Sequence, residues 1–231
     1  MTRRTWIIVS FAALIIVALG TGYAVYFAQQ ANAPHTAPGA AKNCGTPIPT
    51  TGLRTFRIVP NGTTAAYKVH ENLILHNLPS TDATGRTQHV QGDFLIRTNA
   101  APLVANMKIT VDLSTLQTDE SMRDRYVREH ALETATYPQA TFVSTCAQGL
   151  PAHYSDGQTV TFQTVGNLTM HGVTNKETFN VQGKLAGNTI TGTATTTIFM
   201  SDFKIQPPNL ANIAIAENKA IITIAFTAKE G

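Results

Sequence analysis

The stretch that decides the fold, residues 103–145, reads LVANMKITVDLSTLQTDESMRDRYVREHALETATYPQATFVST. Its first part alternates, with apolar side chains at every second position from Ala105 to Leu113 and polar side chains between them. A period of two is typical of a strand that has one face in an apolar core and the other in water. The stretch therefore begins with a half-buried strand.

A short helix is predicted in the middle of the same stretch, over Asp119–Glu133. Charged residues dominate there, apolar residues recur near helical spacing, and Thr118 or Asp119 can cap the helix. Tyr137-Pro138 ends it, because the residue before a proline avoids the helical region. Ala140 then begins a second strand, so a helical crossing joins two strands in a chain that otherwise reads as strands.

The same alternation predicts strands along the rest of the chain. Their ranges are 54–59, 65–78, 89–97, 160–168, 179–185, 190–200 and 220–226. Pro79 to Gln88 is predicted to be a polar loop, and Gly187-Asn188 a tight hairpin. Gly92, in the middle of a strand, indicates a bend or a close approach of another backbone.

Eight or nine long strands, mostly joined as hairpins, predict an all-β domain with an antiparallel barrel. Closing about eight strands into a barrel removes exposed edges and leaves an interior for side chains or one small ligand. Two interpretations stay open: an apolar cavity for a lipid tail, or a core filled by its own side chains. The predicted inward-facing residues are Tyr67, Val69, Met107, Ile109, Val111, Phe142, Phe162, Phe179, Val181, Ile222 and Ile224.

Composition argues against a nucleic-acid partner. The 231 residues carry a formal net charge of +3, and only 13% are charged. Without residues 1–33 the balance falls to +1, because Arg3 and Arg4 are lost and no acidic residue is. A nucleic-acid-binding protein needs a basic face.

The start of the chain, residues 1–33, reads as a signal anchor or a signal peptide. Trp6 to Ala28 has no charged residue and as a helix would be about 34 Å long, enough to cross a bilayer. Arg3 and Arg4 should stay in the cytoplasm and place the remainder outside. The segment can alternatively be a signal peptide that is cleaved near Ala31-Asn32-Ala33, or a twin-arginine export signal. The domain is thus expected to be extracytoplasmic, anchored in the cell membrane by one helix, or secreted or periplasmic after cleavage.

Residues 34–53, rich in proline, alanine and glycine, are predicted to be a tether, and 54–231 the barrel domain. Cys44 in the tether and Cys146 in a strand are expected to form a disulfide, which an extracytoplasmic location permits. Two unrelated thiols are the alternative.

No metal site or catalytic residue is predicted. His70 and His76 stand about 20 Å apart along a strand, and no HExxH motif occurs. Neither GxSxG nor a phosphate-binding GxxxxGK[ST] loop is present, so neither a catalytic site nor a cofactor is expected from these motifs.

Four stretches, in order and at matching spacing, resemble the YceI-like family of secreted lipid-binding proteins over about residues 56–228. They are Val90-Gln91-Gly92-Asp93-Phe94, Val111-Asp112-Leu113 with Thr118, Tyr137-Pro138-Gln139-Ala140-Thr141-Phe142, and Gly166-Asn167-Leu168-Thr169-Met170-His171-Gly172-Val173-Thr174. The resemblance implies an extended lipocalin-like antiparallel barrel. It further implies an apolar channel that holds a polyisoprenoid chain, such as a prenyl phosphate or a quinone tail, and no catalysis.

Two residues are candidates for contacts with the head group of such a lipid. Arg123, on the predicted helix, can meet an anionic group, or it can belong to a solvated face of self-paired charges. His171, in a turn, can contact the ligand at the channel mouth or pack the turn. The predicted function is therefore a membrane-tethered carrier of a long isoprenoid amphiphile, compatible with a homodimer. A ligand-free protein-interaction module and a hydrolase of amphiphiles are the alternatives.

Overall fold

The computed structural model describes residues 52–73, 80–99, 101–210 and 214–231. The strands are β1 (Arg54–Ile58), β2 (Thr64–Leu73), β3 (Thr81–Thr87), β4 (Val90–Arg97), β5 (Leu103–Asp112), β6 (Gln139–Gln148), β7 (Thr159–Met170), β8 (Val173–Ala186), β9 (Thr189–Phe199), β10 (Asn209–Leu210) and β11 (Ala214–Glu230). The helical segments are α2 (Ser121–Tyr126), the π-helical turn η4 (Val127–Ala131), and the 3₁₀ turns η1 (Pro60–Gly62), η3 (Leu113–Thr115) and η5 (Met200–Phe203).

The predicted segment 1–33 and most of the tether lie outside the described residues. Among the residues that are described, we find no helix with the length and apolar character needed to cross a membrane.

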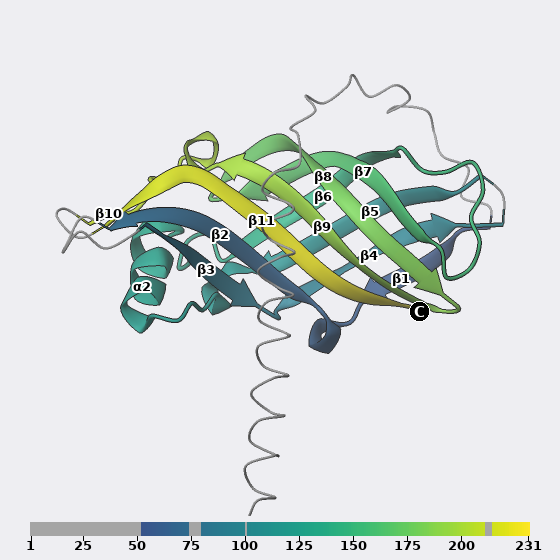
Figure 1. Cartoon of the computed structure of the whole chain (residues 1–231), viewed down its shortest axis with the longest axis horizontal. Helices are drawn as coiled ribbons and strands as arrows, with labels where there is room; N and C mark the ends of the chain where they lie inside the picture. The colour runs from purple at the N-terminus through teal and green to yellow at the C-terminus, as the bar shows by residue number, and fades with distance from the viewer. Residues whose placement is uncertain (1–51, 74–79, 100, 211–213) are drawn as a thin grey trace, which may run out of the picture. The chain divides into compact units, whose positions relative to one another are not determined.

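Eight strands close into an antiparallel barrel (Figure 1). Following the hydrogen bonds gives β1, β4, β5, β6, β7, β8, β9 and β11, and β11 pairs again with β1. The predicted fold class, an all-β closed antiparallel barrel of about eight strands with one short helix, is confirmed within the described ranges.

The last strand, β11, closes the barrel by pairing with β1 and also pairs with β2. It is 17 residues long, and its end, Ala228 to Glu230, pairs with β1. Its earlier part, Ala214 to Ala225, pairs instead with β2, which in turn pairs with β3. The wall of the barrel is therefore continued at one end by the hairpin of β2 and β3.

The prediction of a polar loop from Pro79 to Gln88 was wrong, because Thr81–Thr87 forms β3. Its buried positions carry small side chains, Ala83 and Gly85 among them. A Cβ added at Gly85 would overlap the ring of Tyr67, which lies over it from β2. A strand that passes beneath an aromatic ring needs small inward residues, so it lacks the alternation of bulky apolar side chains by which strands are recognised.

The crossing between β5 and β6 covers the free edge of β3. Arg86 and Gln117 exchange two backbone hydrogen bonds, with N–O distances of 2.8 and 3.0 Å. The helix predicted over 119–133 is confirmed as α2 followed by η4. Its cap is Glu120, whose carboxylate accepts a hydrogen bond from the backbone N–H of Met122 at 3.0 Å, and not Thr118 or Asp119.

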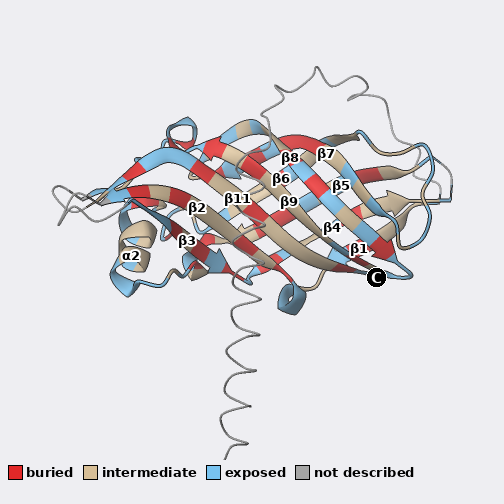
Figure 2. Cartoon of the chain, in the orientation of Figure 1, coloured by how far each residue is buried: buried red, intermediate tan, exposed pale blue. Residues whose placement is uncertain are grey.

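Figure 2 shows buried residues on the strands along the length of the barrel. Near β1 they form an aromatic cluster. Phe56 is fully buried, and its ring stacks on Phe94 with the ring centres 6.1 Å apart. Phe226 meets the other side of this cluster, edge-on to Phe94. The β1 end of the barrel therefore has a cluster of aromatic rings in its core.

Replacing Gly92 with alanine should lower the free energy of unfolding by roughly 2–4 kcal/mol. Gly92 has φ of 152° in β4, and an added Cβ would overlap the carbonyl oxygen of Lys108 in the neighbouring strand. Urea unfolding of the purified chain measures the loss. Gly183→Ala is the matched control, because an added Cβ there has its nearest neighbour at 3.9 Å. Equal stability of the two variants would show that β4 shifts freely at Gly92.

Candidate functional site

A cavity inside the barrel, lined by described residues, has a volume of about 490 Å³. Its walls come from β2, β3, β5, β6, β7, β8, β9 and β11, and the segment formed by α2 and η4 lies along one side. The predicted inward-facing residues that line this main cavity are Tyr67, Val69, Ile109, Val111, Phe142, Phe179, Ile222 and Ile224. The filled-core interpretation is therefore wrong for this part of the barrel.

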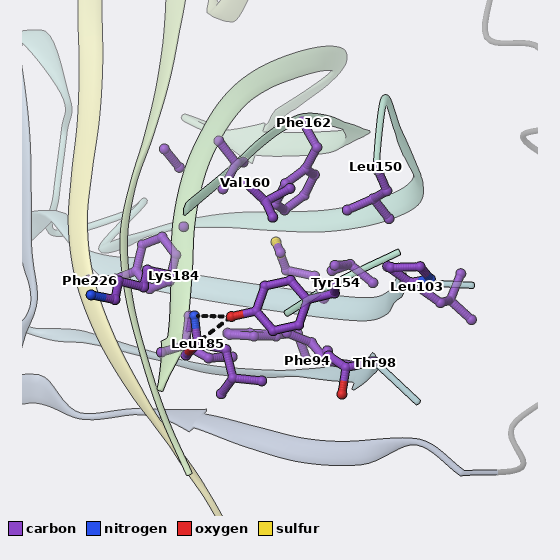
Figure 3. Close-up of a pocket in the computed structure, with 18 of the residues that line it drawn as sticks. Phe94, Thr98, Leu103, Leu150, Tyr154, Val160, Phe162, Lys184, Leu185 and Phe226 are labelled. Atoms are coloured by element: carbon purple, nitrogen blue, oxygen red, sulfur yellow. Dashed lines mark hydrogen bonds between the residues drawn. The ribbon is translucent and has the colours of Figure 1, made fainter. Parts of the chain in front are cut away.

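A smaller cavity of about 110 Å³ lies toward the loop between β6 and β7 (Figure 3). Met107, Phe162 and Val181 line it, as the sequence predicted, together with Leu150 and Tyr154 from that loop. The Tyr154 hydroxyl donates a hydrogen bond to the carbonyl oxygen of Leu185 at 2.6 Å and accepts one from the Leu185 N–H at 3.1 Å. The loop is thereby held against β8.

Sequence analysis missed the contribution of this loop. Leu150 and Tyr154 lie between polar residues and glycines, without any periodicity. The two large side chains in an otherwise polar loop were the available signal, because exposed loops seldom carry them without a packing partner.

The two cavities meet at Ile109 and Ile224, which line both. These two residues come from β5 and β11 and form the boundary between the cavities. All eleven residues predicted to face inward thus line one cavity or the other. Whether they contact a ligand stays a prediction.

The size of the main cavity sets the size of its guest. A cavity of about 150 Å³ lined by aliphatic and aromatic side chains stays dry and takes one benzene ring. The main cavity is about three times larger, so it has room for on the order of 18 to 20 carbon atoms. Its lining is apolar along nearly all of its length, which suits a hydrocarbon chain.

The charged residues that line the main cavity, Glu71, Glu120 and Arg123, all lie at the end formed by β2 and α2. Arg123 donates to Asp119 with an N–O distance of 2.6 Å, and its other terminal nitrogen lies 3.5 Å from a carboxylate oxygen of Glu71. The Glu71 and Arg123 side chains are only 12% and 25% exposed, whereas Asp119 is 87% exposed. We call this group the polar end of the main cavity. The structure thus places the predicted head-group residue Arg123 at the edge of the apolar space.

Tyr67 brings a neutral hydroxyl to the same end. Burial raises the pKa of Tyr67 to about 12, although the nearby charge of Arg123 lowers it in part. The hydroxyl therefore keeps its proton at every physiological pH and can donate a hydrogen bond.

His171, the other predicted head-group residue, lines neither of the two cavities. It lies in the two-residue turn between β7 and β8, where both His171 and Gly172 have positive φ, as a type I′ hairpin requires. Its Nδ1 donates to the carbonyl oxygen of Phe203 at 3.1 Å, and its ring meets Tyr137 edge-on. Nε2 lies 3.3 Å from a carboxylate oxygen of Glu133. These contacts join the turn to η5 and to the end of the helical crossing.

Cys146 lies in β6, but its predicted disulfide partner Cys44 is outside the described residues, so the disulfide stays a prediction. Within the described ranges, no three His, Cys, Asp or Glu side chains gather in a group that could hold a metal ion.

A closed antiparallel barrel of eight strands around an apolar cavity defines a lipocalin-like binding barrel. Within that class the chain belongs to the YceI-like family, since the model of the YceI-like domain matches residues 56–228.

Relatives and solved structures agree with this assignment. A UPF0312 protein of Pseudomonas putida is 39% identical over 110 residues, which cover 44% of this chain and 54% of that protein. One of Pseudomonas savastanoi is 33% identical over 116 residues, covering 47% of this chain and 57% of that protein. The matched part of the chain thus spans about half the length of these curated relatives.

Among solved structures, a polyisoprenoid binding domain from Saccharophagus degradans, implicated in plant cell wall breakdown, has a TM-score of 0.58 at 16% identity. That match covers 78% of this chain and 99% of that domain. BcnA of Burkholderia cenocepacia has a TM-score of 0.55 at 19% identity, covering 74% of this chain and 99% of that protein. Both similarities concern the fold.

Proposed function

We propose that this protein binds one long-chain isoprenoid amphiphile, with the tail in the main cavity and the head group at the polar end. The observation that carries the proposal is an apolar cavity of about 490 Å³ whose charged lining residues all gather at one end. Further support comes from membership of the YceI-like family and from the fold shared with a polyisoprenoid binding domain. The role is carriage or storage of the lipid, without chemical change.

Burial of the tail supplies the affinity. Each buried CH₂ is worth about 0.8 kcal/mol, so 15 buried carbon atoms contribute roughly 12 kcal/mol. Association itself costs at least about 4 kcal/mol in lost translation and rotation. The difference corresponds to a Kd of about 1 µM. The small cavity can take further carbon atoms of a longer tail if the side chains of Ile109 and Ile224 rotate aside.

We also propose that the barrel works outside the cytoplasm, close to a bilayer. The support is in the sequence, where Arg3 and Arg4 precede the uncharged run from Trp6 to Ala28. Tethering would raise the concentration of the protein where such lipids reside. Digestion of intact cells or spheroplasts by added protease tests this location: we expect the barrel to be attacked there, and protection until lysis would contradict it.

The test of function is native mass spectrometry of the full chain purified in mild detergent from its own host. We expect a population with one bound lipid, which extraction and tandem mass spectrometry identify as an isoprenoid. Protein stripped of lipid should then take up one geranylgeraniol (C20) with a Kd of about 1 µM. A saturated C20 alcohol is the matched control for chain type.

The outcomes separate the hypotheses. Preference for geranylgeraniol supports an isoprenoid carrier. Equal binding of the saturated alcohol keeps a lipid carrier and removes the isoprenoid preference. A lipid-free mass that no added amphiphile changes would overturn the proposal and favour a protein-interaction module.

A further inference from the structure

The main cavity presents one cation, and two carboxylates already engage it. Arg123 is the only Lys or Arg among the described residues that line this cavity. Its guanidinium contacts Glu71 inside the barrel and Asp119 on the solvent side. Glu71 is a buried residue, 9% exposed, so it cannot turn away into water without leaving the wall of the cavity. Glu71 and Arg123, whose side chains are 12% and 25% exposed, therefore already balance each other in charge.

The neighbouring charges add to the acidic side. Glu120 lines the same end and caps α2, while Asp124 accepts hydrogen bonds from the N–H and the hydroxyl of Thr118, both at 2.7 Å. Arg128, on η4, donates to the carbonyl oxygen of Leu116 at 3.2 Å and is not part of the cavity lining. An arriving anion would thus meet carboxylates around a guanidinium that is already engaged.

A lipid phosphate carries about −1.5 to −2 charges at neutral pH. Moving such a group out of water is costly unless a cation pairs with it, and the polar end has none to spare. A hydroxyl or carbonyl head group loses far less hydration and can accept a hydrogen bond from Arg123 or Tyr67.

We infer that Glu71 acts as a specificity determinant: by neutralising Arg123 it makes the main cavity accept amphiphiles with uncharged hydroxyl or carbonyl head groups and reject anionic ones. This inference rests on the proposed function and narrows the class of ligand. It also implies that Arg123, the predicted head-group residue, contacts an uncharged group of the ligand and not a phosphate.

Two C20 lipids that differ only in the head group test the inference: geranylgeraniol and geranylgeranyl monophosphate. Each competes with the same fluorescent apolar dye for the full chain in mild detergent at neutral pH. We expect the alcohol to bind at least about tenfold more tightly than the phosphate. Equal or tighter binding of the phosphate would overturn the inference and leave the proposed function intact. Failure of both lipids to bind would overturn both.

Glu71→Gln tests the residue itself. The amide keeps the shape of the side chain and removes the charge, so the terminal nitrogen of Arg123 that faces Glu71 becomes available to an anion, while the other stays paired with Asp119. We expect the ratio of phosphate to alcohol Kd values to fall at least about fivefold, mainly through tighter binding of the phosphate. Asp82→Asn is the matched control: it removes one carboxylate from the same hairpin, where Asp82 pairs with Lys68 and His70 outside the lining of the main cavity.

Asp82→Asn should leave the ratio within about twofold of wild type, because the Asp82 side chain is 44% exposed and a charge in contact with water is screened. An unchanged ratio in Glu71→Gln, or an equal change in both variants, would show that Glu71 does not determine head-group choice. The comparison of the two lipids on the unaltered chain stands even if Glu71→Gln fails to fold.

Discussion

Binding of geranylgeraniol should fall at least about 100-fold when Ala140 is replaced by tryptophan. Ala140 lies in β6 opposite Val111 of β5, and its side chain lines the main cavity beside Phe142. An indole ring there would take the place of roughly four carbon atoms of the tail, which are worth about 3 kcal/mol. Because the ring enters existing space, we expect the fold to tolerate it. Dye displacement and native mass spectrometry measure the loss.

Val143→Trp is the control for the added ring. Val143 lies in the same strand, three positions further on, and its side chain is 44% exposed. We expect it to bind geranylgeraniol with an affinity within about twofold of wild type, since surface substitutions rarely disturb a core. Tight binding by a well-folded Ala140→Trp protein would show that the tail does not occupy the main cavity.

Replacing Phe56 with alanine should lower the free energy of unfolding by about 3–5 kcal/mol. Phe56 is completely buried in β1, the strand that closes the barrel by pairing with both β4 and β11. Its loss would leave a void against Phe94 that the surrounding strands cannot fill without breaking pairs. Urea unfolding, followed by the amide circular-dichroism signal, measures the change.

Phe199→Ala serves as the matched control, because Phe199 at the end of β9 is 50% exposed. We expect a change within about 0.5 kcal/mol. Phe56 lines neither cavity, so the folded fraction of Phe56→Ala should still bind geranylgeraniol within about threefold of wild type. A loss of less than about 1 kcal/mol would contradict the role assigned to the packed β1 end.

Stability and binding are thus expected to depend on different parts of one barrel. The β1 end is packed by aromatic rings, whereas the part beneath β2 and α2 is hollow. A cavity costs stability, because its lining lacks contacts that a packed core would make. We expect the aromatic cluster at the β1 end to offset part of this cost, so that a single domain can hold an apolar ligand.

The sequence predicted the strands and their inward faces wherever bulky apolar residues alternated. Residues such as Val111 and Phe179 repeat at period two because one face of each strand must avoid water, and this requirement is local. The same reasoning failed for β3, whose inward Gly85 is small because Tyr67, distant by 18 positions, lies over it. That contact exists only once β2 and β3 pair.

The sequence by itself determined a closed wall of strands with an apolar inner surface, because alternation along each strand is sufficient to define which face is buried. Only the tertiary structure decided that this surface encloses an open cavity, that Glu71 neutralises Arg123, and that His171 lies away from the cavity. Residues 71 and 123 belong to different elements, and no local pattern specifies the distance between them. The volume of the cavity and the pairing of these two charges depend on how separate elements pack against one another, so neither can be predicted from the sequence of one element.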